Sequence, residues 1–300
     1  MSSVQSLQTP SRVSRADGVP PAVEHRLDVT AERFEFGKNW QRFLELVDED
    51  RVESAAASLR RMLGCDDLEG QSFLDVGCGS GLFSLAARRL GASVRSFDLD
   101  EQSVACAEEL KRRFRAEDDD WRIERGSILD DEYLATLASY DVVYSWGVLH
   151  HTGAMWDAID RATRLVKDDG RLCISIYNDQ GGASRRWRAV KRLYNASPGP
   201  VQSLIAMLFG VWHELRAACV RLVRLQNPLP FADWARKKQD RGMSPWHDMV
   251  DWIGGYPFEV AKPEEVFGFC AARGFRLSYL TTQAGGYGCN EFTFVKGPSA

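Results

Sequence analysis

The chain has 300 residues and a net charge of −4, with 44% hydrophobic and 27% charged residues, values ordinary for a soluble globular protein. Its seven cysteines form neither a C-x-x-C pair nor a Cys/His cluster, so the sequence indicates no disulfide framework and no metal site, and a reducing cytoplasm fits best. The N-terminus lacks an apolar signal core, and no run of 18 uncharged apolar residues occurs. We therefore expect neither secretion nor a membrane-spanning helix.

The first 66 residues divide into two parts. Residues 1–24 are rich in Ser, Pro, Val and Gln and are predicted to be a flexible tail. Residues 25–66 follow, with a helical pattern over 30–63, a break near Asp48–Asp50 and Gly64 in the usual C-terminal position. Within this part, Phe36–Trp40 is interpreted as a gate over a ligand, with a place in the helical core as the alternative.

Strands and helices then alternate through residues 67–178. Strands are expected at 72–76, 93–97, 121–125, 141–145 and 171–177, separated by helices at 81–90, 100–115, 131–138 and 155–166. The pattern resumes over residues 263–300, with a helix at 263–272 and strands at 275–282 and 290–295. This alternation predicts an α/β, Rossmann-like, doubly wound sheet of seven mostly parallel strands. Residues 179–262 are then an α-helical cap insertion at the carboxyl edge, where such folds bind ligands.

The stretch SFLDVGCGSGLF, residues 72–83, is the first candidate binding motif. Its glycines are spaced G-x-G-x-G, whereas a dinucleotide turn reads G-x-G-x-x-G, and no Lys follows as in a P-loop. Asp75 at the strand end would repel a diphosphate and attract a cationic amine or sulfonium. A plain tight turn is the alternative interpretation.

This stretch resembles motif I of the class I S-adenosylmethionine-dependent methyltransferases, and further motifs of that family follow in order. Asp98 matches the acidic residue that binds the ribose diol, although it could instead cap the next helix. Residues 124–128, 140–151 and 165–172 resemble the later motifs, with Ser127 where Asp is frequent, and Trp146 could belong to the core. The resemblance implies S-adenosylmethionine as cofactor, S-adenosylhomocysteine as product, and a cofactor site formed by Asp75, Gly77, Cys78, Gly79, Gly81, Asp98, Leu99, Ser127, Ile128, Ser145 and Trp146.

The L-D-V-G-C-G-x-G turn of residues 74–81 and the V-L-x-H ending of the motif in residues 140–151 make the chain similar to the ubiquinone-biosynthesis type of O-methyltransferase. Methyl transfer from a sulfonium needs positioning, and a hydroxyl acceptor also profits from a base near neutral pKa. Candidate bases are His151 and His150 at the end of the fourth strand, with His247 in the insertion as a rival. His150 and His151 could instead be ordinary hydrogen-bonded loop residues. Some members of that type use a divalent metal, but the sequence shows no metal constellation.

The insertion offers candidate acceptor-binding groups. Arg185 and Arg186 could clamp a carboxylate or phosphate, or simply be solvated at a helix start. Trp246 and Tyr256 belong to an aromatic stretch, 246–259, that fits a small-molecule pocket or plain core.

Residues 201–225 are predicted to form an amphipathic helix. Three partners for its apolar face stay open: the sheet domain as a cap, an anionic membrane surface, or a second copy in a homodimer. The membrane interpretation places the protein in the cytoplasm, peripheral at the inner membrane surface.

The sequence thus favours a methyltransferase that acts on a small-molecule or lipid-like acceptor, such as a quinone precursor, at oxygen. Residues 178–245 hold twelve basic and four acidic residues, which keeps an RNA methyltransferase as an alternative. Nucleic acid is nevertheless not expected as a partner, because the whole chain is acidic and no RNA-binding module is recognisable. A non-catalytic partner that keeps the fold is the third hypothesis.

Overall fold

A computed structural model describes residues 44, 47–115, 117–225, 227, 252–286 and 288–298. The expectations for the tail, for the gate at 36–40, and for Trp246 and His247 lie outside the described residues.

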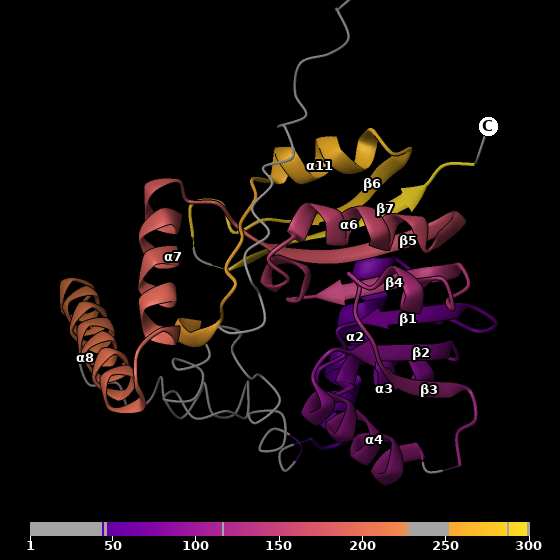
Figure 1. Cartoon of the computed structure of the whole chain (residues 1–300), viewed down its shortest axis with the longest axis horizontal. Coiled ribbons are helices and arrows are strands. Elements are labelled where there is room, and N and C mark those ends of the chain that lie inside the picture. Colours follow the sequence, from indigo (N-terminus) through magenta and orange to yellow (C-terminus); the bar gives the residue numbers. More distant parts are fainter. Residues whose placement is uncertain are drawn as a thin grey trace, which may run out of the picture.

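The centre of the fold is a seven-stranded sheet with the order β3-β2-β1-β4-β5-β7-β6 (Figure 1). Strands β1 to β5 pair in parallel, and β7 runs antiparallel to both β5 and β6. This arrangement confirms the predicted Rossmann-like, mostly parallel sheet. The strands are β1 (Ser72–Val76), β2 (Ser93–Asp98), β3 (Trp121–Arg125), β4 (Tyr140–Trp146), β5 (Val166–Tyr177), β6 (Phe275–Thr281) and β7 (Cys289–Lys296).

Helices cover both faces of the sheet and bury a separate hydrophobic core on each (Figure 1). On one face lie α2 (Glu49–Leu63), α3 (Leu82–Arg89) and α4 (Glu101–Arg115). On the other lie α5 (Asp131–Leu134), α6 (Met155–Arg164) and α11 (Pro263–Ala271).

Helix α2 begins where the sequence predicted a break. The Asp48 side chain accepts a hydrogen bond from the backbone N–H of Arg51 at 2.9 Å, which caps the helix. Gly64 ends the helix in the left-handed conformation, as expected.

Strand β5 begins five residues earlier than predicted. Tyr140 of β4 pairs with Val166, but Val142 pairs with Arg171, so residues 167–170 bulge out between the two pairings. Asp169 has a positive φ of 60° within this bulge. Residues 167–170 are therefore built into the strand as an irregularity.

The insertion leaves and rejoins the sheet at one point. Asn178 and Ala261 form an isolated parallel bridge just after β5, and the N–H of Ala261 donates to the carbonyl of Tyr177 at 3.0 Å. Between them, α7 (Gly182–Asn195) and α8 (Gly199–Val223) stand beside the sheet (Figure 1). The two ends of the insertion thus fix the base of α7 at the carboxyl edge of β5.

Candidate functional site

The glycine turn after β1 depends on residues without side chains. Gly77, Gly79 and Gly81 all have positive φ values, of 74°, 53° and 80°. A Cβ on Gly77 would lie 2.4 Å from Cγ1 of Val148, which belongs to the loop after β4. The turn therefore fits closely against the segment that carries the predicted histidines.

Asp75 lies buried at the end of β1, with 3% of its surface exposed. Its carboxylate accepts a hydrogen bond from the hydroxyl of Ser84 on α3 at 2.5 Å. Burial raises the pKa of Asp75 to about 7, against the opposing effect of the Ser84 hydrogen bond. A cationic group placed against Asp75 would favour its ionised form.

Asp98 ends β2 beside the glycine turn. One carboxylate oxygen accepts the N–H of Gly79 at 3.0 Å and the other accepts the N–H of Asp100 at 3.0 Å. These bonds orient the carboxylate at the carboxyl edge of the sheet, where a vicinal diol could bind both oxygens. The neighbouring Leu99 is 39% exposed, as suits a side chain that packs on a ligand.

The loop after β3 lies next to Asp98, because the N–H of Gly126 donates to the Asp98 carbonyl at 3.0 Å. Ser127 uses its hydroxyl to accept the N–H of Leu129 at 3.1 Å, and Ile128 is buried in the core. The structure thus brings Ser127 to the same edge as Asp98, while the Ile128 side chain packs inward.

The end of β4 supplies the remaining predicted cofactor residues. Ser145 is buried and donates to the carbonyl of Val76 at 2.9 Å, which ties β4 to β1 beside the turn. Trp146 is 44% exposed, and its indole N–H donates to Glu291 on β7 at 3.0 Å. Its exposure shows that Trp146 is a surface side chain rather than part of the core.

The glycine cradle, the oriented Asp98 carboxylate and the buried Asp75 together fit the nucleoside and aminoalkyl parts of an S-adenosyl cofactor. The family model described as a methyltransferase domain matches residues 74–172. This part of the chain therefore carries a methyltransferase domain. S-adenosylmethionine is the cofactor of such domains, as the sequence resemblance implied.

Similar proteins cover only parts of the chain. The ubiquinone biosynthesis O-methyltransferase of Xanthomonas oryzae pv. oryzae strain PXO99A is 34% identical over 112 residues, which cover 37% of this chain and 45% of that protein. The chain therefore spans less than half the length of this curated relative. Ribosomal protein L11 methyltransferase of Thermotoga petrophila is 54% identical over 46 residues, covering 15% of this chain and 17% of that protein.

A solved structure shares the fold. An O-methyltransferase family protein from Burkholderia thailandensis aligns with a TM-score of 0.50 and 14% identity, covering 88% of this chain and 60% of that chain. At this identity the likeness establishes the methyltransferase fold alone.

The two described candidate bases lie side by side on a short 3-10 turn, η1 (Leu149–His151), after β4. Nδ1 of His151 lies 2.6 Å from the carbonyl oxygen of Pro257, so Nδ1 carries the proton and Nε2 is the basic nitrogen of the neutral ring. His150 is fully buried, and neither of its ring nitrogens makes a hydrogen bond of sound geometry within the described residues. Burial and the neighbouring His151 hold the pKa of His150 well below its usual range.

The aromatic residues of the insertion gather next to these histidines. The ring of Tyr177, the last residue of β5, lies 4.1 Å from the ring of His150 and 5.3 Å from that of Phe258. A small cavity of about 20 Å³, room for one water, opens here. It is lined by Tyr177, Asn178, Gln180, Ser184, Trp187, Trp252, Phe258 and Gly288.

Sequence reasoning missed the buried ammonium behind this cavity. Lys191 on α7 is fully buried, donates to the carbonyl of Trp252, and lies 4.7 Å and 5.0 Å from the ring centres of Trp252 and Phe258. Burial lowers its pKa from 10.5 to about 7. The only sequence signal was its place among arginines, which suggested a solvated face.

The predicted acceptor-binding residues are not brought together. Arg185 and Arg186 are exposed on α7, whereas Tyr256 is buried with 8% of its surface exposed. Among the described residues, Tyr177, Trp187, Trp252 and Phe258 form the aromatic wall instead, and of these Trp252 and Phe258 lie in the predicted aromatic stretch.

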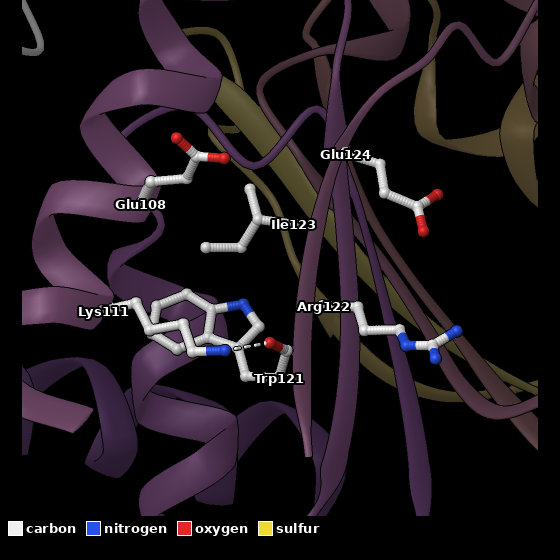
Figure 2. A pocket seen from close by; sticks show the side chains of 6 residues that line it. All are labelled: Glu108, Lys111, Trp121, Arg122, Ile123 and Glu124. Atoms are coloured by element: carbon white, nitrogen blue, oxygen red, sulfur yellow. Dashed lines mark hydrogen bonds between the residues drawn. The ribbon is translucent and has the colours of Figure 1, made fainter. Parts of the chain in front are cut away.

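A larger cavity, of about 350 Å³, lies between α4 and the edge strand β3 (Figure 2). Lys111 donates to the carbonyl of Trp121 at 2.5 Å on its wall. The lining residues are Glu108, Lys111, Trp121, Arg122, Ile123 and Glu124. None of the predicted site residues lines it, so this cavity is not the cofactor site. Across the described residues, no group of three or more His, Cys, Asp and Glu side chains has the arrangement of a metal site.

Proposed function

We propose that this chain is a methyltransferase that moves a methyl group from S-adenosylmethionine to an oxygen of a small-molecule or lipid-like acceptor. One observation carries the proposal: the glycine turn touches the loop that holds His150 and His151, since a Cβ on Gly77 would meet Val148. The cofactor side and the candidate base side of the site therefore adjoin. The partial likeness to a ubiquinone biosynthesis O-methyltransferase supports oxygen as the acceptor atom.

When bound, S-adenosylmethionine supplies an activated methyl group, so the protein has three tasks: binding, alignment and exclusion of water. Asp98 and the glycine turn hold the nucleoside end. The wall of Tyr177, Trp187 and Phe258 offers an apolar surface for an acceptor and excludes water.

Of the candidate bases, His151 has the geometry of a positioned general base. The carbonyl of Pro257 fixes its ring and leaves Nε2 as the basic nitrogen. His150 is less suited, because its lowered pKa makes it a weak base at neutral pH. His247 stays a sequence-based candidate.

The function is tested with methyl-tritiated S-adenosylmethionine and an extract of cells that lack the protein. After incubation, the label is partitioned among organic solvent, water and acid-precipitable polymer. Organic label supports a lipid-like acceptor, and aqueous label supports a polar metabolite. Label in polymer would contradict the proposal and support RNA or protein as acceptor, and no protein-dependent label in any phase would contradict methyl transfer.

The base is tested in the same assay with purified acceptor. His151→Phe is expected to lower kcat by about 100-fold or more, with unchanged affinity for S-adenosylhomocysteine by calorimetry. His150→Phe is the matched control, because it removes the neighbouring imidazole. An equal loss in both variants, or full activity in both, would contradict His151 as the base.

A further inference from the structure

Exposed hydrophobic side chains concentrate on α7 and α8. Of seventeen exposed large hydrophobic residues in the described part of the chain, thirteen lie between Val190 and Leu225. A monomeric soluble protein rarely leaves so large a contiguous apolar surface uncovered unless it serves as an interaction surface. We call residues 182–225 the helical hairpin.

The apolar side chains of α8 form an outward stripe. At 100° per residue, Leu204, Leu208, Val211, Leu215 and Leu222 fall within about 60° of one another. Their exposed fractions range from 48% to 63%. Because these positions recur along nearly the whole helix, the stripe is long and narrow rather than a local patch.

The opposite side of α8 is already occupied. Ala206 is buried with Tyr194 and Ile253, and the ring of Phe209 packs on Trp187 and Trp252 at 5.2 Å and 5.4 Å. These contacts attach α8 to α7 and to the aromatic wall. The inner side of α8 thus packs on α7 and on the segment of Trp252 and Ile253, and the expectation of a cap on the sheet stays a prediction.

The helical hairpin is also strongly basic. It contains eight Lys and Arg residues and a single acidic residue, Glu214, within a chain whose net charge is −4. Its exposed arginines include Arg185, Arg186, Arg192, Arg216 and Arg224. An exposed apolar stripe on a strongly basic helical hairpin is the combination that binds an anionic lipid surface.

We propose that the helical hairpin docks on an anionic lipid bilayer, with the outward stripe of α8 in the acyl boundary and the arginines at the headgroups. The inference deepens the proposed function, because it rests on a lipid-like acceptor for the same site. The positive charge of the helical hairpin favours a bilayer over a second copy of the chain. A two-fold contact would bring two basic hairpins together, whereas anionic lipids would neutralise their charge.

The docked hairpin would place the acceptor wall close to the lipid. Trp187 belongs to α7 and lines the small cavity, while the same indole packs against Phe209 of α8. The aromatic wall is thus continuous with the surface that meets the bilayer. A lipid-soluble acceptor would reach the histidines without crossing water.

By length and composition alone, α8 is also the one helix of the described residues that could cross a membrane. The sequence had suggested no such helix. The contacts of Phe209 with Trp187 and Trp252 favour a helix that lies on the surface, since a spanning α8 would have to break them.

The test is co-sedimentation of the full chain with vesicles. Phosphatidylcholine vesicles are compared with vesicles that contain about one third phosphatidylglycerol, at low and at high NaCl. We expect about 10-fold or stronger binding to the anionic vesicles, lost at high salt, and release by an alkaline carbonate wash. Equal binding to both vesicle types, no binding, or resistance to the wash would overturn the proposal.

Two pairs of substitutions locate the contact. Leu208→Ser with Leu215→Ser is expected to weaken binding by about 10-fold or more, since both side chains enter the acyl boundary. Phe267→Ser with Leu280→Ser is the matched control, because these residues are 46% and 44% exposed elsewhere on the molecule, and binding should not change. Equal effects of the two pairs on vesicle binding would overturn the proposal. It would also be overturned if sedimentation velocity showed a dimer of the parent protein that the first pair of substitutions converts to a monomer.

The charge contribution is tested separately. Arg216→Gln is expected to weaken binding to anionic vesicles by about five-fold, with no effect on binding to phosphatidylcholine. Unchanged binding to anionic vesicles would overturn the electrostatic part of the proposal.

Failure of the docking proposal is distinguishable from failure of the proposed function. Vesicle binding is measured without cofactor, so it does not depend on methyl transfer. Methyl transfer to a detergent-dispersed extract, with no vesicle binding, would overturn docking alone. Vesicle binding with no methyl transfer would overturn the proposed function, and the lipid surface would remain.

Discussion

Lys191 allows a quantitative test of how the acceptor wall is built. Its ammonium is fully buried, and burial lowers its pKa from 10.5 to about 7. Between these two pKa values the unfolded chain binds a proton that the folded chain does not. Stability from this group therefore rises as pH rises through the window from about 7 to about 10.5, and below about 7 the whole penalty is present.

The shift of about 3.5 units corresponds to about 5 kcal/mol at low pH, at about 1.36 kcal/mol per unit. About 2 kcal/mol of that penalty disappears between about pH 6.5 and about pH 8.5. Lys191→Met removes the penalty and also loses the hydrogen bond to Trp252 and the ring contacts, together about 2 to 3 kcal/mol. We expect the variant to be about 2 kcal/mol more stable than the parent at pH 6.5 and about equal at pH 8.5.

The measurement is urea unfolding, followed by tryptophan fluorescence, of both proteins at both pH values. Comparison with the parent cancels the other titrating groups, such as Asp75. Lys111→Met is the matched control, because Lys111 also donates to a backbone carbonyl, that of Trp121, but is only partly buried. Parallel pH dependence in the parent and in Lys191→Met would refute a buried charge at this position.

Three further outcomes follow from the cofactor side. Asp98→Ala should weaken binding of S-adenosylhomocysteine by about 100-fold or more in calorimetry, since a charged acceptor of two hydroxyl hydrogen bonds is lost; unchanged affinity would contradict the ribose assignment. Gly77→Ala should abolish binding of S-adenosylhomocysteine, because its Cβ would lie 2.4 Å from Val148. Gly147→Ala is the control, because Gly147 has a similar positive φ but open space around it, so this substitution should cost only backbone strain. Equal losses of affinity in the two variants would contradict the close fit. Binding should also weaken about 10-fold from about pH 8 to about pH 6, because the raised pKa of Asp75 leaves its carboxyl group mostly protonated at the lower pH. Asp75→Asn should remove this pH dependence. A pH dependence that persists in the variant would exclude Asp75 as its source.

The parts of the fold that sequence could predict are those set by local pattern. The glycines of the turn need positive φ, and the apolar runs before them read as buried strands, so β1, the turn and Asp98 could be placed before any coordinates. The early start of β5 could not be predicted, because it depends on the register of Tyr140 and Val142 against another strand. Register is a property of the pair, and one strand's sequence does not specify it.

The acceptor side was less predictable for the same physical reason. In sequence, Lys191 is one of several basic residues on a helix, and nothing local separates it from the exposed Arg192. Its burial comes from Trp252 and Phe258, which lie about 60 residues further along the chain. Contacts at that separation are set by tertiary packing, so composition indicated the charge of the insertion but not which charge would be buried.

The basic character of α7 is divided between two faces with different roles. Arg188, Lys191 and Asn195, at i, i+3 and i+7, lie along one side of the helix and donate to the carbonyls of Phe258, Trp252 and Gly254. That side holds the returning segment against the cavity. Arg185, Arg186 and Arg192 remain exposed. The positive charge of α7 therefore both anchors the aromatic wall and leaves arginines for the proposed lipid surface. For this reason the net charge of the segment alone could not separate binding of an acceptor from binding of a membrane.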